Sequence, residues 1–193
     1  MEKTLKNSET STIWAQDRAH FTHPWTHFDS FRKEGSLVMD RAEGIHIYDA
    51  DGNRYLDSVG GLWCMNIGYG REEMVEAIAA QTRRMAFASP FVDMTNAPAA
   101  QLAAKLAELA PGSLNHVLFG CGGSTGNDSA FRLIQYYWAC KGQKHRRHII
   151  ARTGSYHGTT YAAQSIGGKP TDRSDEFDFI ADIIHHVAEP NIH

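Results

Sequence analysis

Cysteine is scarce in this sequence, long hydrophobic runs are missing, and neither sign of charge dominates. Cys64, Cys121 and Cys140 are odd in number and widely spaced, which indicates neither a disulfide framework nor a Cys-x-x-Cys metal pair and favours a reducing, cytoplasmic location. A net charge of −3 gives no reason to expect nucleic acid or an anionic membrane as a partner. Because no apolar run approaches about 20 residues and segment 1–13 is polar, we expect neither a membrane-spanning helix nor a secretory signal.

The apolar content that the sequence does have is enough to form a core. Hydrophobic residues occupy 42% of the 193 positions, which is typical of a globular chain and not of a disordered one. The length fits one full domain or two small ones. Residues 1–12 predict a loose arm at the start of the chain.

The most informative stretch is the glycine-rich segment 120–128. It follows a short apolar run at 116–119, which predicts a buried strand, and precedes a helical pattern at 129–141, with Asn127 and Asp128 available to cap the helix. A strand that leads through a glycine-rich turn into a helix presents free backbone N–H groups and the positive end of the helix dipole. The segment therefore predicts an anion site, most often one for phosphate.

Two familiar phosphate loops do not fit this segment. A Walker loop needs a lysine beside its glycines, and the sequence has no lysine between Lys105 and Lys141. A dinucleotide-binding loop would need a glycine where Thr125 stands. A tight turn without a ligand stays open as an alternative, because glycine serves turns as readily as it serves phosphates.

Around this segment the pattern alternates between strands and helices. Short strands joined partly by an Asp-Gly hairpin turn are predicted at 37–40, 44–48 and 54–58. Amphipathic helices are predicted at 71–87 and from about 96 to 110. A further strand at 148–151 completes a strand–helix–strand order, which implies a right-handed crossover and a parallel sheet.

A histidine-rich segment near the start raises the question of a metal site. His20, His23 and His27 have helix-like spacing, but Pro24 interrupts a helix and no carboxylate or cysteine completes a ligand set. We therefore expect no metal, and we interpret the segment as an aromatic loop that lines a pocket or an interface.

Two further loops carry aromatic residues among glycines. The segment 60–70 predicts a buried loop that lets the backbone approach something closely, and Trp63 within it has either a core-packing or a ligand-facing role. In segment 152–160, glycines flank Tyr156 and His157 just past a strand end, which is the usual place for ligands in an open α/β sheet. A planar side chain beside a phosphate site predicts a phosphorylated, flat cofactor.

The chain resembles the N-terminal portion of a class III aminotransferase, a family of fold type I enzymes that depend on pyridoxal phosphate. Within that family it is most similar to the ω-amino-acid:pyruvate transaminases. The resemblance is carried by five segments, at 44–57, 60–70, 123–128, 136–138 and 152–168. It implies an incomplete α/β fold, with a small-domain segment and N-terminal arm at 1–85 and the first part of the large, parallel-sheet cofactor domain at 86–193.

The resemblance also implies roles for particular residues. Gly123 and Ser124 match the pair that holds the cofactor phosphate, and Tyr156 matches the aromatic residue that stacks on the pyridine ring. Three aromatic residues match the walls of the substrate pocket: Trp25, Trp63 and Phe91. The implied reaction moves an amino group from an ω-amino acid or amine to a keto acid such as pyruvate, in a homodimer whose pocket is shared between subunits.

Two departures from the family pattern affect these expectations. The family loop reads Ser-Gly-Ser-Glu-Ala-Asn, so Gly122 lacks a hydroxyl, Thr125 replaces an acid and Gly126 replaces an alanine at a cost of up to about 1 kcal/mol. None of the seven lysines fits the place of the Schiff-base lysine, so we expect no catalytic residue in this chain and no activity from the chain alone. The lysines are at positions 3, 6, 33, 105, 141, 144 and 169.

Three hypotheses follow from the sequence. The chain is part of an ω-transaminase, or a truncated and catalytically inactive homologue, or a phosphate-binding module without turnover. The amine donor stays open among β-alanine, taurine, an aromatic amine and a diamine.

Overall fold

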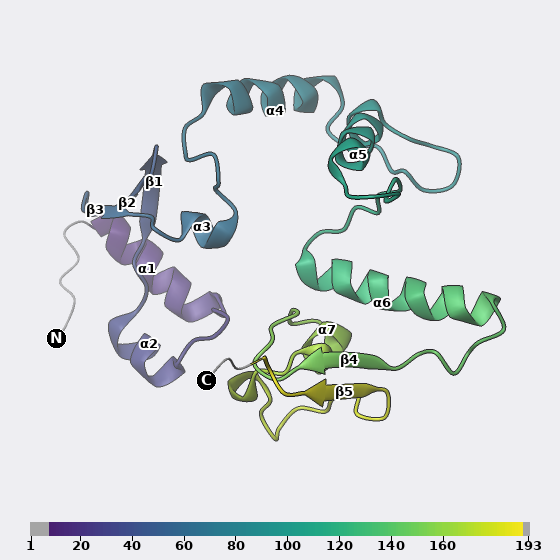
Figure 1. Cartoon of the computed structure of the whole chain (residues 1–193). Helices are drawn as coiled ribbons and strands as arrows, with labels where there is room; N and C mark the ends of the chain where they lie inside the picture. Colours follow the sequence, from purple (N-terminus) through teal and green to yellow (C-terminus); the bar gives the residue numbers. More distant parts are fainter. Residues whose placement is uncertain (1–7, 191–193) are drawn as a thin grey trace. The chain divides into compact units, whose positions relative to one another are not determined.

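The computed structural model describes residues 8–190 (Figure 1), which divide into two compact units, one up to Met94 and one from Thr95 on. The expected division into domains at residues 85 and 86 stays a prediction. Of the predicted loose arm, residues 1–7 lie outside the described part of the chain. Residues 8–12 belong to a helix, in which Thr10 is buried, so for these residues the prediction of a loose arm is wrong.

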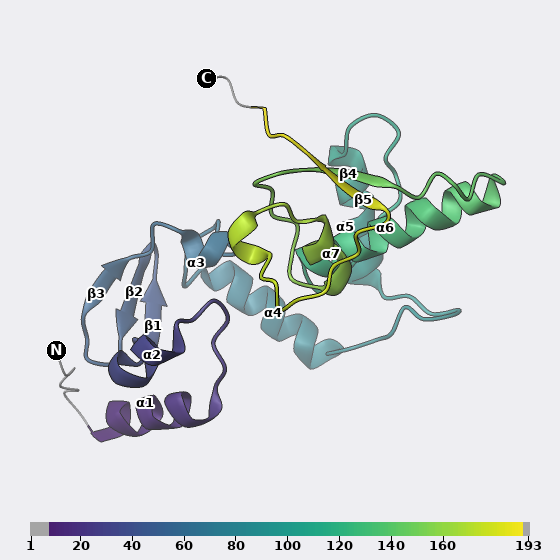
Figure 2. The ribbon, with the colours of Figure 1, turned by 90° about the horizontal axis from the view of Figure 1, so that it is seen from below.

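The first unit begins with two helices, α1 (Ser8–His20) and α2 (Phe28–Glu34), which lie close to each other in Figures 1 and 2. Gly35 ends α2 with φ 64°, and a side chain there would overlap the Trp14 indole. The Ser36 hydroxyl donates to Asp17 Oδ2 across 2.6 Å, which lowers the pKa of the Asp17 carboxyl. These contacts hold α1 against the end of α2.

A three-stranded antiparallel sheet follows, in the order β1 (Met39–Glu43), β2 (His46–Asp49) and β3 (Arg54–Leu56). The hairpin turn between β2 and β3 is organised by the Asp49 carboxylate. This carboxylate accepts from the Asn53 backbone and side chain and from the Tyr55 hydroxyl, each across 2.8 Å. Hydrogen bonding from the Asn53 side chain is the largest of the effects that lower the pKa of Asp49 to about 2. The predicted hairpin is confirmed, with strand ends shifted by a few residues.

Helices complete the first unit and open the second. Helix α3 (Gly60–Trp63) is a single short turn, and α4 (Glu72–Arg84) confirms the predicted amphipathic helix. In the second unit, α5 (Ala97–Leu109) begins at Asn96, whose side-chain oxygen accepts from the Ala99 N–H across 3.0 Å. That side-chain cap, together with a proline in the first turn, explains why the sequence predicts this helix start well.

The rest of the second unit is a strand–helix–strand arrangement built after α6 (Gly123–Cys140). Its elements are β4 (Ile149–Arg152), α7 (Tyr161–Ile166), the 3-10 turn η1 (Pro170–Asp172) and β5 (Ile184–Val187). Strands β4 and β5 pair in parallel. The sheet is parallel, as expected, but the expected partner of β4 was the run at 116–119, and β5 was not predicted. Ala151, Ile166 and Ile184 form the small buried core between the two strands and α7.

Two expectations about the backbone are wrong. Residues 116–119 form no strand, since the described residues offer this apolar run no partner strand, and Leu118 is 68% exposed. The predicted buried loop at 60–70 instead presents Leu62 and Trp63 on the surface of its unit. In both places the apolar residues led us to predict burial. An apolar sequence does not determine whether the residues that bury it belong to the same chain.

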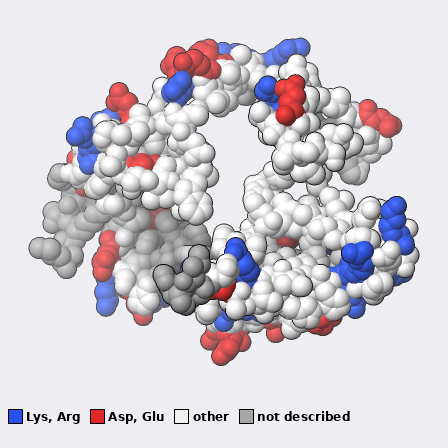
Figure 3. Space-filling view, viewed as in Figure 1, with Lys and Arg blue, Asp and Glu red and all other residues white. Residues whose placement is uncertain are grey.

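The surface carries charge of both signs. On the face seen in Figure 3, Lys and Arg lie among Asp and Glu, without an extended region of one sign. Among the described helices, none combines the length and apolar character that crossing a bilayer requires.

Candidate functional site

Helix α6 begins directly inside the glycine-rich segment. Gly122 stands before the helix in an extended conformation, with φ 173° and ψ 169°, and provides no side-chain cap. The Thr125 hydroxyl donates to the Gly122 carbonyl across 2.8 Å, and the Gly126 N–H reaches the same carbonyl across 3.0 Å. The first N–H groups of the helix therefore emerge from a loop of glycines.

The predicted capping by Asn127 and Asp128 is wrong, because the helix starts at Gly123 and both residues lie in its second turn. Their side chains bind another segment. Asn127 Nδ2 donates to the His157 carbonyl across 2.6 Å, and Asp128 Oδ1 accepts from the Ala163 N–H across 2.9 Å. Sequence reasoning missed this function, although 124, 127 and 128 share one helix face by their spacing.

Ser124 is the third member of this helix face. Its Oγ accepts from the Thr159 N–H across 3.1 Å, and its carbonyl accepts from the Thr160 hydroxyl across 3.5 Å. The start of α6 thus holds residues 157–163 by hydrogen bonds to three residues spaced along one helix face. We call residues 156–159 the Tyr156 turn.

Gly158 lets the Tyr156 turn approach the helix closely. Its φ is 131°, and a Cβ at this position would lie 2.7 Å from Ser124 Cβ and 2.8 Å from Ser124 Cα. Any larger residue would push the turn off the helix. The glycine is therefore needed both for its backbone conformation and for the space it leaves.

The three residues predicted to bind the cofactor lie on these two adjoining segments. Gly123 and Ser124 form the first helical turn, and Tyr156 opens the turn that docks on it, with its side chain 56% exposed. A Cβ built on Gly122 or Gly123 would meet nothing within 4 Å, so the space around the helix start is open.

The electrostatics at the helix start favour an anion. The Ser124 oxygen already accepts an N–H, which leaves its hydroxyl proton to donate. Asp128, the acid nearest along the chain, has its carboxylate turned to the Ala163 N–H. Backbone N–H groups and the helix dipole add positive potential. A phosphate therefore fits this site, and the exposed Tyr156 ring offers a face for a planar ring.

The three predicted pocket residues lie in the first unit and are all exposed. Trp25, Trp63 and Phe91 are 70%, 79% and 76% exposed. Trp25 has φ 57°, Trp63 has φ 69° and Val92, next to Phe91, has φ 62°. Non-glycine residues seldom adopt such values, which cost about 1–3 kcal/mol each and cluster at binding sites. Their role in a substrate pocket stays a prediction.

Two of the three histidines considered for a metal site, His23 and His27, have structural partners. His23 Nε2 lies 2.8 Å from Asp17 Oδ1, and the His27 ring accepts from the Ser30 N–H at the start of α2. Within residues 8–190, no three His, Cys, Asp or Glu side chains gather as metal ligands would.

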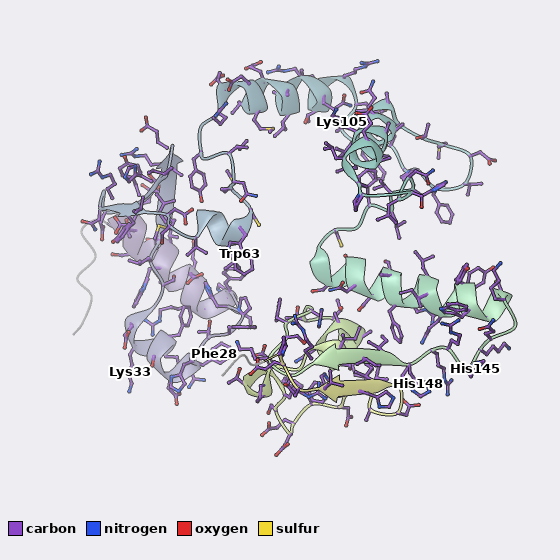
Figure 4. All side chains as sticks on the ribbon, in the orientation of Figure 1. Phe28, Lys33, Trp63, Lys105, His145 and His148 are labelled. Atoms are coloured by element: carbon purple, nitrogen blue, oxygen red, sulfur yellow. The ribbon has the colours of Figure 1, made fainter. Side chains whose placement is uncertain are left out.

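The lysines within residues 8–190 lie at the surface of their units. Lys33 lies on α2 and Lys105 on α5, as Figure 4 shows, and Lys105 pairs with Glu108 across 2.8 Å. Lys141 follows the far end of α6, and Lys169 lies 3.7 Å from Asp172. Lys3 and Lys6 are outside the described residues.

Comparison with known protein families decides the assignment. Residues 30–192 match the family described as "Aminotransferase class-III". The chain belongs to the class III aminotransferase family. The family predicted from the five resembling segments is therefore confirmed, and members of this family depend on pyridoxal phosphate.

Individual relatives agree with this family. The chain is 38% identical over 190 residues to a putrescine–pyruvate aminotransferase of Pseudomonas aeruginosa, covering 98% of the chain and 41% of that protein. Among solved structures, a thermostable (S)-enantioselective ω-transaminase of Thermomicrobium roseum matches with TM-score 0.90 and 40% identity, over 97% of this chain and 41% of the other. An ω-transaminase of Pseudomonas jessenii in complex with PMP matches with TM-score 0.89 and 30% identity, over 92% of this chain and 39% of the other.

The chain therefore spans about two fifths of the length of these class III aminotransferases. Over that part, the predicted incomplete fold type I transferase architecture is confirmed. The helix start at Gly123 and the Tyr156 turn belong to a fold whose members bind the predicted cofactor.

Replacing Gly158 by alanine should loosen the Tyr156 turn. The added methyl collides with Ser124, so we expect Gly158→Ala to lower the free energy of unfolding by roughly 1–3 kcal/mol. Gly142→Ala is the matched control, because Gly142 also has a positive φ, 73°, but a Cβ there meets nothing within 4 Å. Chemical denaturation of both variants measures the difference, and equal losses would contradict the close contact.

Proposed function

We propose that this chain contributes the phosphate- and ring-binding part of a transaminase, which moves an amino group from an ω-amino acid or amine to a keto acid such as pyruvate. The observation that carries the proposal is the docking of the Tyr156 turn onto the first turn of α6. Through the Thr159 N–H to Ser124 bond and the Asn127 to His157 bond, a phosphate site and an aromatic face stand on adjoining backbone.

The chain's own residues bind and orient the cofactor. The Gly123 and Ser124 N–H groups and the Ser124 hydroxyl would hold the phosphate, and the Tyr156 ring would stack on the pyridine ring. Pyridoxal phosphate, when bound, supplies the electron sink that this amino transfer requires. Asn127 keeps the Tyr156 turn in place by donating to the His157 carbonyl. The resemblance assigns proton transfer to a lysine, and none of the seven lysines of the chain fits the position of that lysine.

The donor and acceptor are inferred from relatives and from the pocket residues. A relative named for putrescine and pyruvate, 38% identical to this chain, supports a diamine donor and pyruvate as acceptor. The exposed rings of Trp25, Trp63 and Phe91 would give the donor apolar walls. β-Alanine, taurine and aromatic amines are the other donors to compare.

We further propose a cytoplasmic homodimer. The three cysteines are free and exposed, which suits a reducing compartment. Many large apolar side chains are exposed on the described units, including Leu102 and Leu109 on α5 and Ile134 on α6. Exposed apolar surfaces of this extent are typical of interfaces with further protein, here in part the second subunit.

Replacing Ser124 by alanine should weaken binding of the phosphate selectively. We expect Ser124→Ala to raise the Kd of pyridoxal phosphate by about tenfold or more, since a hydrogen bond to a charged group is lost. The Kd of pyridoxal, which has no phosphate, should rise much less, because for this ligand only the Thr159 N–H to Ser124 bond behind the Tyr156 turn is lost. Absorbance titration measures both ligands.

Ser129→Ala is the control for this comparison, because Ser129 lies further along α6. It should leave both dissociation constants unchanged. An equal effect of Ser124→Ala on pyridoxal and pyridoxal phosphate would place the phosphate elsewhere.

The 193-residue chain alone should form no alanine from pyruvate with β-alanine, putrescine or an aromatic amine as donor. The reason is that no lysine of the chain takes the family's lysine position. A coupled alanine assay tests this expectation. Alanine formation above the cofactor-only control would refute it, whereas tight cofactor retention without turnover would favour a phosphate-binding module.

A further inference from the structure

The short turn that carries Trp63 has an unusual backbone. Gly60, Gly61, Leu62 and Trp63 have φ values of 57°, 57°, 58° and 69°, so four successive residues are left-handed. Two of them have large side chains, for which this conformation is unfavourable. We call residues 60–63 the Trp63 turn. Its conformation persists only if the surrounding residues impose it.

One carboxylate supplies most of that constraint. Asp57 Oδ2 accepts from the Gly61 N–H and from the Tyr69 hydroxyl, each across 2.7 Å. The Asp57 carbonyl accepts from the Gly60 N–H across 3.2 Å. The hydrogen bond from Tyr69 is the largest of the effects that lower the pKa of Asp57, and the same bond raises the pKa of Tyr69. Asp57 therefore ties the entry of the turn to a residue that follows it.

Both partners are fixed to the antiparallel sheet. The Asp57 N–H donates to the Ile45 carbonyl across 3.0 Å. Tyr69 exchanges two backbone hydrogen bonds with Gly44, of 2.8 and 3.1 Å. Because Asp57 and Tyr69 are each held by the segment at 44–45, the carboxylate bridges two rigid points on either side of the turn.

The Tyr69 hydroxyl also closes the space beneath the turn. A Cβ on Gly61 would lie 3.1 Å from this oxygen and 2.8 Å from Met65 Cγ. The Met65 N–H donates to the Gly60 carbonyl across 2.9 Å. The backbone of the turn is therefore tightly packed on its inner side.

The outer side of the turn contrasts with this packing. Leu62 and Trp63 are among the most exposed large apolar side chains of the described residues, and Figure 4 shows Trp63 projecting from α3. A strained backbone held on one side and an exposed indole on the other are typical of a residue presented to a ligand. Core packing within this unit does not account for Trp63.

We propose that Asp57 and Tyr69 are positioning residues that hold Trp63 in its left-handed turn and thereby set the size of amine donor that the enzyme accepts. This inference rests on the proposed transaminase function. Neither residue needs to touch the substrate, because both act through the backbone of the Trp63 turn.

The test removes the hydroxyl of Tyr69 and compares a matched change nearby. Tyr69→Phe deletes one hydrogen bond to Asp57 and keeps the ring. Tyr48→Phe is the control, since Tyr48 lies on β2 and contacts the Arg41 guanidinium through its ring, 3.5 Å from the centroid. Asp57→Asn keeps the shape of the side chain but not its charge. Its effect on both readouts should lie between those of the wild type and Tyr69→Phe.

Two readouts are measured in the complete enzyme that carries this chain. Fluorine NMR of protein labelled with 5-fluorotryptophan follows the indole, with Trp63→Phe identifying its resonance. Steady-state kinetics give kcat/KM for β-alanine and for a bulky aromatic amine. We expect Tyr69→Phe to shift or broaden the Trp63 resonance. We also expect it to raise the ratio of kcat/KM for the bulky aromatic amine to kcat/KM for β-alanine by about fivefold or more. Tyr48→Phe should change neither.

Each other outcome has a definite meaning. An unchanged Trp63 resonance in Tyr69→Phe would overturn the positioning role, and a shifted resonance with an unchanged donor ratio would overturn the specificity role. A wild-type enzyme without transaminase activity would overturn the proposed function and the specificity role together. The fluorine spectrum would still decide whether Tyr69 holds Trp63.

Discussion

The second unit depends on the contact between the first turns of α6 and the Tyr156 turn. Ser124, Asn127 and Asp128 present an acceptor, a donor and a second acceptor along one helix face, and each meets a backbone group of residues 157–163. Gly158 makes this approach sterically possible. Because these bonds are made by the helix start itself, the groups that would hold a phosphate and the ring that would cover a pyridine are fixed to each other.

In the first unit, the feature that stands out is a group of residues with unfavourable, positive φ values. The non-glycine residues with positive φ among those described are Trp25, Leu62, Trp63 and Val92, each of which is, or adjoins, a predicted pocket aromatic. The aromatic side chains are exposed, whereas the backbone at or beside each of them has an unfavourable conformation. At the Trp63 turn, the carboxylate of Asp57 supplies the compensating hydrogen bonds. The exposed indole of Trp63 thus stands on a backbone that Asp57 and Tyr69 hold from the other side of the turn.

Local patterns in the sequence predicted the elements whose determinants are local. Asn96 with a proline in the first turn marked α5, and the Asp-Gly pair marked the β2–β3 hairpin. The predictions failed where the outcome depends on residues distant in the sequence. The run at 116–119 has no neighbouring strand among the described residues, so it forms no strand. Asn127 and Asp128 bond residues 157 and 163 instead of capping their helix. The left-handed turn at Trp63 was missed because its cause, a hydrogen bond from the Tyr69 hydroxyl to the Asp57 carboxylate, spans 12 residues. The family was recognisable from its motifs, because the residues of a motif are those that the family's chemistry requires.

A crystal structure of the protein grown with pyridoxal phosphate tests the central claim most directly. The account predicts phosphate oxygens within about 3.2 Å of Ser124 Oγ and the Gly123 nitrogen, with the pyridine ring about 3.5–4.0 Å from the Tyr156 ring. It also predicts that the Asn127 to His157 bond is retained. A phosphate bound away from the start of α6, or a Tyr156 turn released from Ser124 in the complex, would contradict it.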